Sequence, residues 1–148
     1  MSHHDAVYVH ALLHRLEGKH AGEGGMKGWS NADYWNDQVG SYHPLFPLMC
    51  EYILTLSEQH TRTTTDTAAS INSSDRVVKF IRQIDLASQT AGGGKQTGWQ
   101  PSLFLNLCMD GFRYDDEPCV TFCESVTTHE YRLLLDLYCG KCVGASHR

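Results

Sequence analysis

The stretch YVHALLHRLEG, residues 8–18, carries the clearest helical pattern in the chain. Its apolar side chains recur at intervals of three and four residues, the spacing of one face of an α-helix, at Val9, Leu12, Leu13 and Leu16. Asp5 is expected to cap the start of this helix, and Gly18 is a natural end. The apolar stripe centres on Val9 and Leu16 and leaves Tyr8 and Arg15 on the opposite side.

The rest of the chain also has the pattern of helices joined by turns, and no convincing strand-type alternation is found. Further helices are expected over residues 30–39, 47–58, 75–89, 101–109, 119–126 and 129–139. Ser30 is the expected N-cap of the second helix, and Thr127 and Glu130 form a T-x-x-E capping box before the last one. The sequence therefore predicts an all-α fold, a compact bundle of about six or seven helices.

A single domain is expected over residues 1–148, with three segments outside its helices. Residues 18–29 and 91–98 are rich in glycine and are expected to be loops. Residues 59–74 are rich in Thr and Ser and have almost nothing to bury, so we expect a flexible surface insertion. The segment AGGGKQTG (91–98) does not fit a phosphate-binding loop, because glutamine follows its lysine and a helix precedes it.

The composition is that of a globular protein, with 41% hydrophobic and 20% charged residues. The formal charge of −5 and the scattered Lys and Arg residues argue against binding to nucleic acid. No apolar run approaches the roughly 20 residues that span a bilayer, and the N-terminus lacks a signal-peptide pattern. A cytoplasmic location is therefore expected, in which the six cysteines are thiols or metal ligands.

Three histidines and one glutamate are the candidates for catalysis. His10 and His14 lie one helical turn apart, with Glu17 a turn further along, at the border of the apolar stripe, and His43 sits on a rigid Tyr-His-Pro turn. Histidine transfers protons near neutral pH, so these residues could act as acid and base. The three histidines could equally bind a divalent metal ion, zinc or iron, with Glu17 or Glu51 as a further ligand. They could also serve only in helix packing.

Aromatic residues near this cluster are candidate ligand contacts. Tyr34 and Trp35 would each give a ring to a pocket wall or to the core, and Tyr42 could supply a hydroxyl group beside His43. A rival metal site, suited to structural zinc, would use four thiolates, from Cys119, Cys123, Cys139 and Cys142. Plain burial is the competing explanation, because Cys119 and Cys123 share an apolar stripe.

Two blocks of the chain resemble a family of small uncharacterised bacterial and fungal proteins. The first block, residues 10–46, resembles a pattern that runs roughly H-x-x-x-H-R-x-E, N-A-x-Y-W and G-x-H-P. The second comprises WQPSLFLNLC (99–108) and HEYRLLLDLYC (129–139). The first two helices also look like a tetratricopeptide-type hairpin, although no second copy follows at the roughly 34-residue period of such repeats.

The resemblance implies a helical fold and a set of residues but no reaction. The chain departs from the family in its loop KHAGEGGMKGW (19–29), and it has Asn36 and Asp37 where the relatives carry basic residues. If that basic pair binds an anion in the relatives, this protein is not expected to do the same.

The leading expectation is a small-molecule enzyme of the isomerase, lyase, cyclase or hydrolase type, acting in an interhelical pocket without a nucleotide cofactor. A non-catalytic helical interaction or binding module is the alternative, and a zinc-stapled structural domain is the third hypothesis. A homodimer is left open. The hypotheses differ in whether the imidazoles of His10, His14 and His43 converge on one cavity.

Overall fold

Six α-helices form the described part of the chain, which in this computed structural model comprises residues 2–20, 25–60, 74–90 and 98–146. The helices are α1 (His3–His20), α2 (Gly25–Val39), α3 (Leu45–His60), α5 (Asp75–Thr90), α6 (Pro101–Arg113) and α7 (Glu117–Ser146). No strand occurs within these residues. The predicted all-α bundle of six or seven helices is therefore confirmed.

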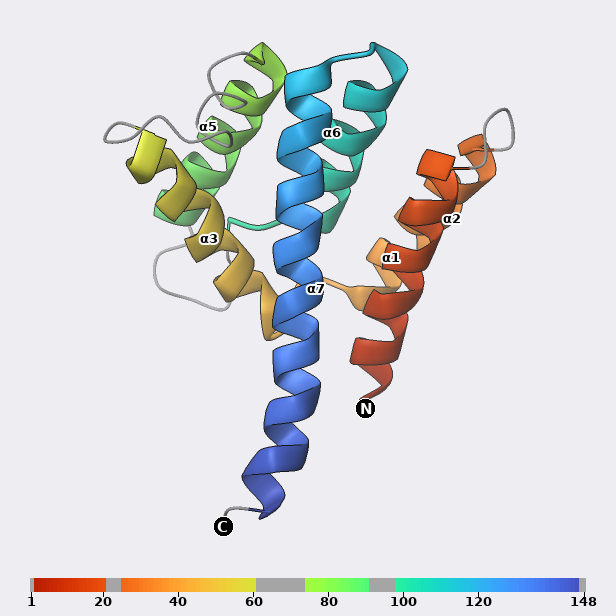
Figure 1. The fold of residues 1–148 in the computed structure, drawn as a ribbon, viewed down its shortest axis with the longest axis vertical. Coiled ribbons are helices and arrows are strands. Elements are labelled where there is room, and N and C mark those ends of the chain that lie inside the picture. Colours follow the sequence, from red (N-terminus) through yellow and green to blue (C-terminus); the bar gives the residue numbers. More distant parts are fainter. Residues whose placement is uncertain (1, 21–24, 61–73, 91–97, 147–148) are drawn as a thin grey trace.

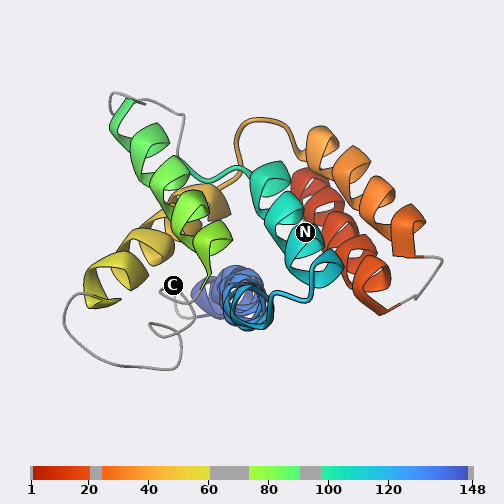
Figure 2. The same ribbon diagram turned by 90° about the horizontal axis from the view of Figure 1, so that it is seen from above.

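The long helix α7 runs through the middle of the molecule, and the other helices lie to either side of it (Figure 1). α1 and α2 form an antiparallel hairpin on one side, and α3 and α5 lie on the other. Seen from above, α6 stands next to α7 and between it and the α1–α2 hairpin (Figure 2). α6 thus joins the two halves of the bundle.

The main core lies where α3, α5, α6 and α7 meet, and α1 adds side chains to it from the hairpin side. Its largest fully buried members are Tyr8, Phe46, Trp99, Phe104 and Phe122. The predicted stripe of α5 is confirmed, because the side chains of Val77, Phe80, Ile81 and Ile84 are all buried. In α1 the buried side chains include Tyr8, Leu12 and Arg15, whereas Leu13 and Leu16 are exposed. The stripe predicted from Val9 and Leu16 was therefore placed on the wrong side of this helix.

Gly18 and Gly28 allow α1 and α2 to approach each other closely. A methyl group on Gly28 would lie 2.4 Å from the backbone nitrogen of Gly18, and one on Gly18 would lie 2.6 Å from Cδ2 of Trp29. The prediction that residues 18–29 form a loop is thus wrong at both ends, since only residues 21–24 lie outside the described helices. These glycines serve close packing rather than chain flexibility.

Two helix starts also differ from the prediction. Ser2, not Asp5, caps α1: the Asp5 backbone N–H donates to the Ser2 hydroxyl (3.2 Å), and the Ser2 N–H donates to the Asp5 carboxylate (3.0 Å). Ser30 lies inside α2 and caps nothing. α2 begins earlier because its first residues pack against the end of α1.

The last two predicted helices are one helix, α7, which has 30 residues. Asp116 precedes it and accepts a hydrogen bond from the backbone N–H of Cys119 (3.2 Å). Thr127 and Glu130 lie in the middle of α7, so they form no capping box. Their side chains face α1 instead, where Arg15 bonds to both.

The predicted loops at 59–74 and 91–98 fall mostly on residues 61–73 and 91–97, which lie outside the described residues. At the edges of these segments, α3 continues to His60, and Ser74 is buried with its hydroxyl donating to Asp116 (2.8 Å). None of the described helices is both long and apolar enough to cross a membrane.

Candidate functional site

A buried polar network joins α1 to α7. The Tyr8 hydroxyl donates a hydrogen bond to one oxygen of Glu130, and Nη2 of Arg15 donates to the other. The same Arg15 nitrogen lies 3.4 Å from the Thr127 hydroxyl, and the guanidinium stands 4.9 Å from the centre of the Phe104 ring. Glu130 is only 1% exposed, so its charge depends on these two partners.

The network is built to keep Tyr8 neutral and Arg15 charged. Burial, and next the neighbouring Glu130 carboxylate, raise the pKa of Tyr8 well above its ordinary value. Burial, the largest single influence, lowers the pKa of Arg15, but attraction to Glu130 and the hydrogen bond to it, together with smaller contributions from Cys108 and Tyr8, raise that pKa above its ordinary value. The result is a buried ion pair with a phenol as the second donor.

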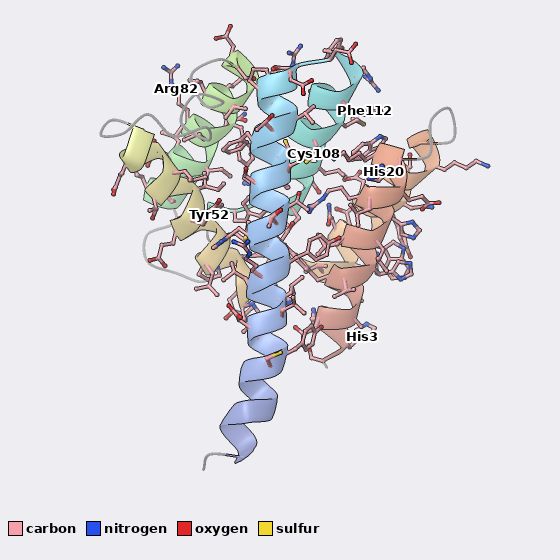
Figure 3. All side chains as sticks on the ribbon, in the orientation of Figure 1. His3, His20, Tyr52, Arg82, Cys108 and Phe112 are labelled. Atoms are coloured by element: carbon pink, nitrogen blue, oxygen red, sulfur yellow. The ribbon has the colours of Figure 1, made fainter. Side chains whose placement is uncertain are left out.

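A cavity of about 370 Å³ lies directly beside this network, between α1, α2, α6 and α7. Its apolar wall comprises Leu16, Trp29, Cys108, Phe112, Val120 and Cys123. Its polar lining comprises Arg15, Lys19, Glu124, Thr127, Thr128 and Tyr131. Figure 3 places Cys108 and Phe112 on α6, between α7 and the α1–α2 hairpin. An ion pair between Lys19 and Glu124 (2.7 Å) bridges α1 and α7.

Arg15 is the polar group that the cavity shares with the buried network. Both of its hydrogen bonds leave from Nη2, and no described residue accepts one from Nε or Nη1. The Tyr131 hydroxyl is buried nearby and has no hydrogen-bond partner within the described part of the chain. A molecule in the cavity can therefore offer an oxygen atom to donors that the protein leaves unused.

His43 is placed in the core and away from the other predicted histidines. It is fully buried; its Nδ1 accepts the backbone N–H of Leu45 (3.0 Å), so its Nε2 carries the proton shared with Asp5 (2.9 Å). Its ring stacks on that of Tyr8, with centroids 5.0 Å apart. These contacts give His43 a complete structural role between α1 and α3.

His10, His14 and Glu17 do lie together, on an exposed face of α1. The Nε2 atoms of His10 and His14 are 3.0 Å apart, and Nδ1 of His14 lies 2.7 Å from the Glu17 carboxylate. The half-buried Trp35 stacks on His10 with centroids 4.1 Å apart. None of these four residues lines the cavity.

The three imidazoles therefore do not form the predicted metal site. Among the described residues, no three His, Cys, Asp or Glu side chains are placed to hold one ion. The other suggested ligand, Glu51, is exposed on α3.

The four-cysteine zinc site is not formed either. Cys119 and Cys123 are buried, whereas Cys139 is exposed and lies 16 residues beyond Cys123 on the same helix, about 24 Å away at the rise of an α-helix. The side chain of Cys142 lies outside the described residues. Contacts with the thiols of Cys108 and Cys119, together with burial, raise the pKa of Cys123 well above its ordinary value. This group is therefore an inert, protonated thiol.

The aromatic residues predicted as ligand contacts do not line the cavity. Tyr34 and Tyr42 are 57% and 51% exposed, and neither lines the cavity. Trp29 does line it, although sequence analysis gave that residue no role. Arg15 and Glu130 were also missed as a pair, since nothing local links residues 115 positions apart. The available signal was that Tyr8 and Arg15, two helical turns apart, share one face of the first helix.

Fold and site together define an all-α protein with a cavity that opens beside a buried arginine–glutamate pair. Comparison with protein-family models, curated proteins and solved structures gave no match. The family resemblance described above therefore stays a prediction.

Proposed function

We propose that this protein binds a small, mainly apolar molecule that carries an oxygen acceptor, such as a carbonyl or carboxylate group. The observation that carries the proposal is the cavity beside Arg15. Its volume of about 370 Å³ falls in the range of small-molecule sites, about 300–1,000 Å³.

The apolar wall of the cavity determines which kind of ligand skeleton can be buried there. Trp29 and Phe112 provide flat aromatic surfaces, and Val120 and Cys123 add small apolar groups from α7. An aromatic or alicyclic ring system would bury its surface against these residues, and apolar burial is the main source of affinity in such sites.

The polar lining of the cavity determines which functional group of the ligand is favoured. Because Glu130 already compensates the charge of Arg15, the spare guanidinium donors favour an oxygen acceptor without requiring an anion. A hydrogen bond to a charged donor contributes about 1.5–3 kcal/mol, which corresponds to about tenfold or more in affinity.

The enzyme expected from the sequence has less support than binding. His10, His14 and His43 do not meet, and none of them lines the cavity. Acid–base catalysis by the predicted histidines would need an imidazole within reach of the ligand. The proposed role is therefore a binding module, as in the alternative hypothesis.

The test uses the fluorescent probe 1-anilinonaphthalene-8-sulfonate and two competitors of nearly the same shape. 2-Acetylnaphthalene carries a carbonyl group, and 2-ethylnaphthalene lacks it. We expect the probe to bind the protein and the ketone to displace it at about one tenth of the hydrocarbon's concentration.

Matched variants locate the binding. Val120→Phe should fill the cavity and abolish probe binding. Ala87→Phe is the control, because Ala87 lines a second cavity between α2, α5 and α6. Equal binding to both variants, or loss only in Ala87→Phe, would overturn the proposal.

A further inference from the structure

We propose that His10 and His14 form a two-imidazole site for a divalent late transition-metal ion, Cu²⁺ or Ni²⁺. The proposal concerns the exposed face of α1 and is independent of the cavity. It replaces the three-histidine site expected from the sequence with a smaller one that has a different ligand set.

The distance between the two nitrogen atoms supports this assignment. Nε2 of His10 and Nε2 of His14 are 3.0 Å apart. Two metal–nitrogen bonds of about 2.1 Å span this distance when they meet at about 90°. A tetrahedral angle would require a separation of about 3.4 Å, so the pair fits adjacent positions of a tetragonal or octahedral ion, as Cu²⁺ and Ni²⁺ prefer.

Glu17 holds His14 in the protonation state that a metal needs. The Glu17 carboxylate lies 2.7 Å from Nδ1 of His14, so that nitrogen carries the proton and Nε2 keeps its lone pair. A carboxylate behind a metal-binding histidine is a common arrangement that orients the ring and strengthens the ligand. In the metal-free structure the His10 Nε2–H donates to this lone pair across the 3.0 Å contact, so metal binding requires the His10 proton to move from Nε2 to Nδ1.

Trp35 orients His10, the second proposed metal ligand. Its ring stacks on His10 at 4.1 Å between centroids and 17° between planes, and the rings of His10 and His14 lie at 22° to each other. Both imidazoles are thus ordered before a metal arrives, which lowers the entropic cost of binding. His14 is only 21% exposed in its side chain, whereas His10 is exposed and open to solvent. Water would supply the remaining ligands.

The position of Trp35 also provides a local readout, because a bound Cu²⁺ ion next to His10 should quench its fluorescence. The experiment titrates Cu²⁺ into the full chain carrying His3→Ala and His4→Ala, since those exposed histidines would compete for the ion. We expect saturable quenching, absent when Trp35 is replaced by Phe, and an electron paramagnetic resonance spectrum with nitrogen ligands.

Variants of the three residues test the ligand set. His10→Ala or His14→Ala should raise the dissociation constant by about a hundredfold, because the chelate is lost. Glu17→Gln should raise it by about tenfold. His20→Ala is the matched control, since His20 is exposed on the same helix, and it should leave the affinity unchanged.

The side chains of His10 and Glu17 are exposed and that of His14 is half-buried, so the variants should fold, which circular dichroism of the metal-free proteins checks. Quenching that persists with unchanged affinity in both His10→Ala and His14→Ala would overturn the proposal. So would binding that disappears entirely with the His3→Ala and His4→Ala substitutions. Neither result depends on whether the cavity binds a ligand.

Discussion

Two faces of α1 carry most of its polar side chains, and they differ in what surrounds them. One face presents Tyr8 and Arg15 to a carboxylate on α7 that is fully buried. The other presents His10, His14 and Glu17 to solvent. The same kinds of contact, an ion pair and a hydrogen bond, occur on both faces.

Burial decides what these contacts contribute. On the exposed face water can replace a lost partner, so each contact is worth little. On the buried face a lost partner leaves a charge or a donor without compensation, which costs far more than the contact contributes. The fold should therefore be sensitive to changes at Glu130 and tolerant of changes at Glu17.

The largest effect is expected for Glu130→Ala. This change leaves the Arg15 guanidinium buried without its carboxylate and removes the acceptor of Tyr8, so the free energy of unfolding should fall by about 3–5 kcal/mol. Urea denaturation measures it. Replacing Arg15 by Met and Glu130 by Leu together should recover much of the loss, and a double variant as unstable as Glu130→Ala would contradict this explanation.

A smaller loss is expected for His43→Ala. The substitution opens a cavity in the core, leaves the backbone N–H of Leu45 without its acceptor, and removes the His43 donor from the Asp5 carboxylate. The free energy of unfolding should fall by about 2–3 kcal/mol. The exposed His20→Ala variant is the control and should be unchanged within error.

Tyr8→Phe should lower stability by about 1.5–2 kcal/mol at neutral pH, because Glu130 loses one donor. It should also change the response to alkali. The pKa of Tyr8 is raised in the folded state, so above about pH 10 the unfolded chain binds fewer protons and stability falls with rising pH.

Since one tyrosine contributes up to about 1.4 kcal/mol per pH unit, the alkaline slope should become shallower in Tyr8→Phe. Urea denaturation between pH 9 and pH 11 (about the range in which tyrosine ionises) measures the slope. An identical slope in both proteins would show that Tyr8 already ionises normally in the folded state.

The smallest effect is expected for Glu17→Gln. The carboxylate is 53% exposed in its side chain and pairs with a histidine on its own helix, so stability should change by no more than about 0.5 kcal/mol. Thermal unfolding of the two proteins in the same buffer measures it. A loss comparable to that of Glu130→Ala would erase the distinction between the two faces.

The helices themselves could be predicted because their cause is local. The periodicity of Val77, Phe80, Ile81 and Ile84 marks the buried face of α5 correctly, and Pro101 starts α6 as expected. In α1 the same method chose the wrong face. Leu13 is exposed and Leu16 lines the cavity at 37% exposure, whereas Arg15 is buried because a partner on α7 compensates its charge.

The candidate site was harder to predict because it depends on contacts between distant residues. His10, His14 and Glu17 lie together as their spacing on one helix requires. The position of His43 could not be predicted from its spacing in the sequence, because it depends on how α3 packs against α1. The cavity has no signature in the sequence either, because its wall combines single residues from four helices.

The central claim is that a small molecule binds in the cavity beside Arg15. The most direct test maps the binding site of 2-acetylnaphthalene by nuclear magnetic resonance. ¹H–¹⁵N correlation spectra would be recorded while 2-acetylnaphthalene is added to the protein. We predict that the largest shifts occur at the amides of Arg15, Trp29, Val120 and Thr127, around the cavity. Shifts confined to His10, His14 and Trp35, or to the second cavity around Ala87, would contradict the account.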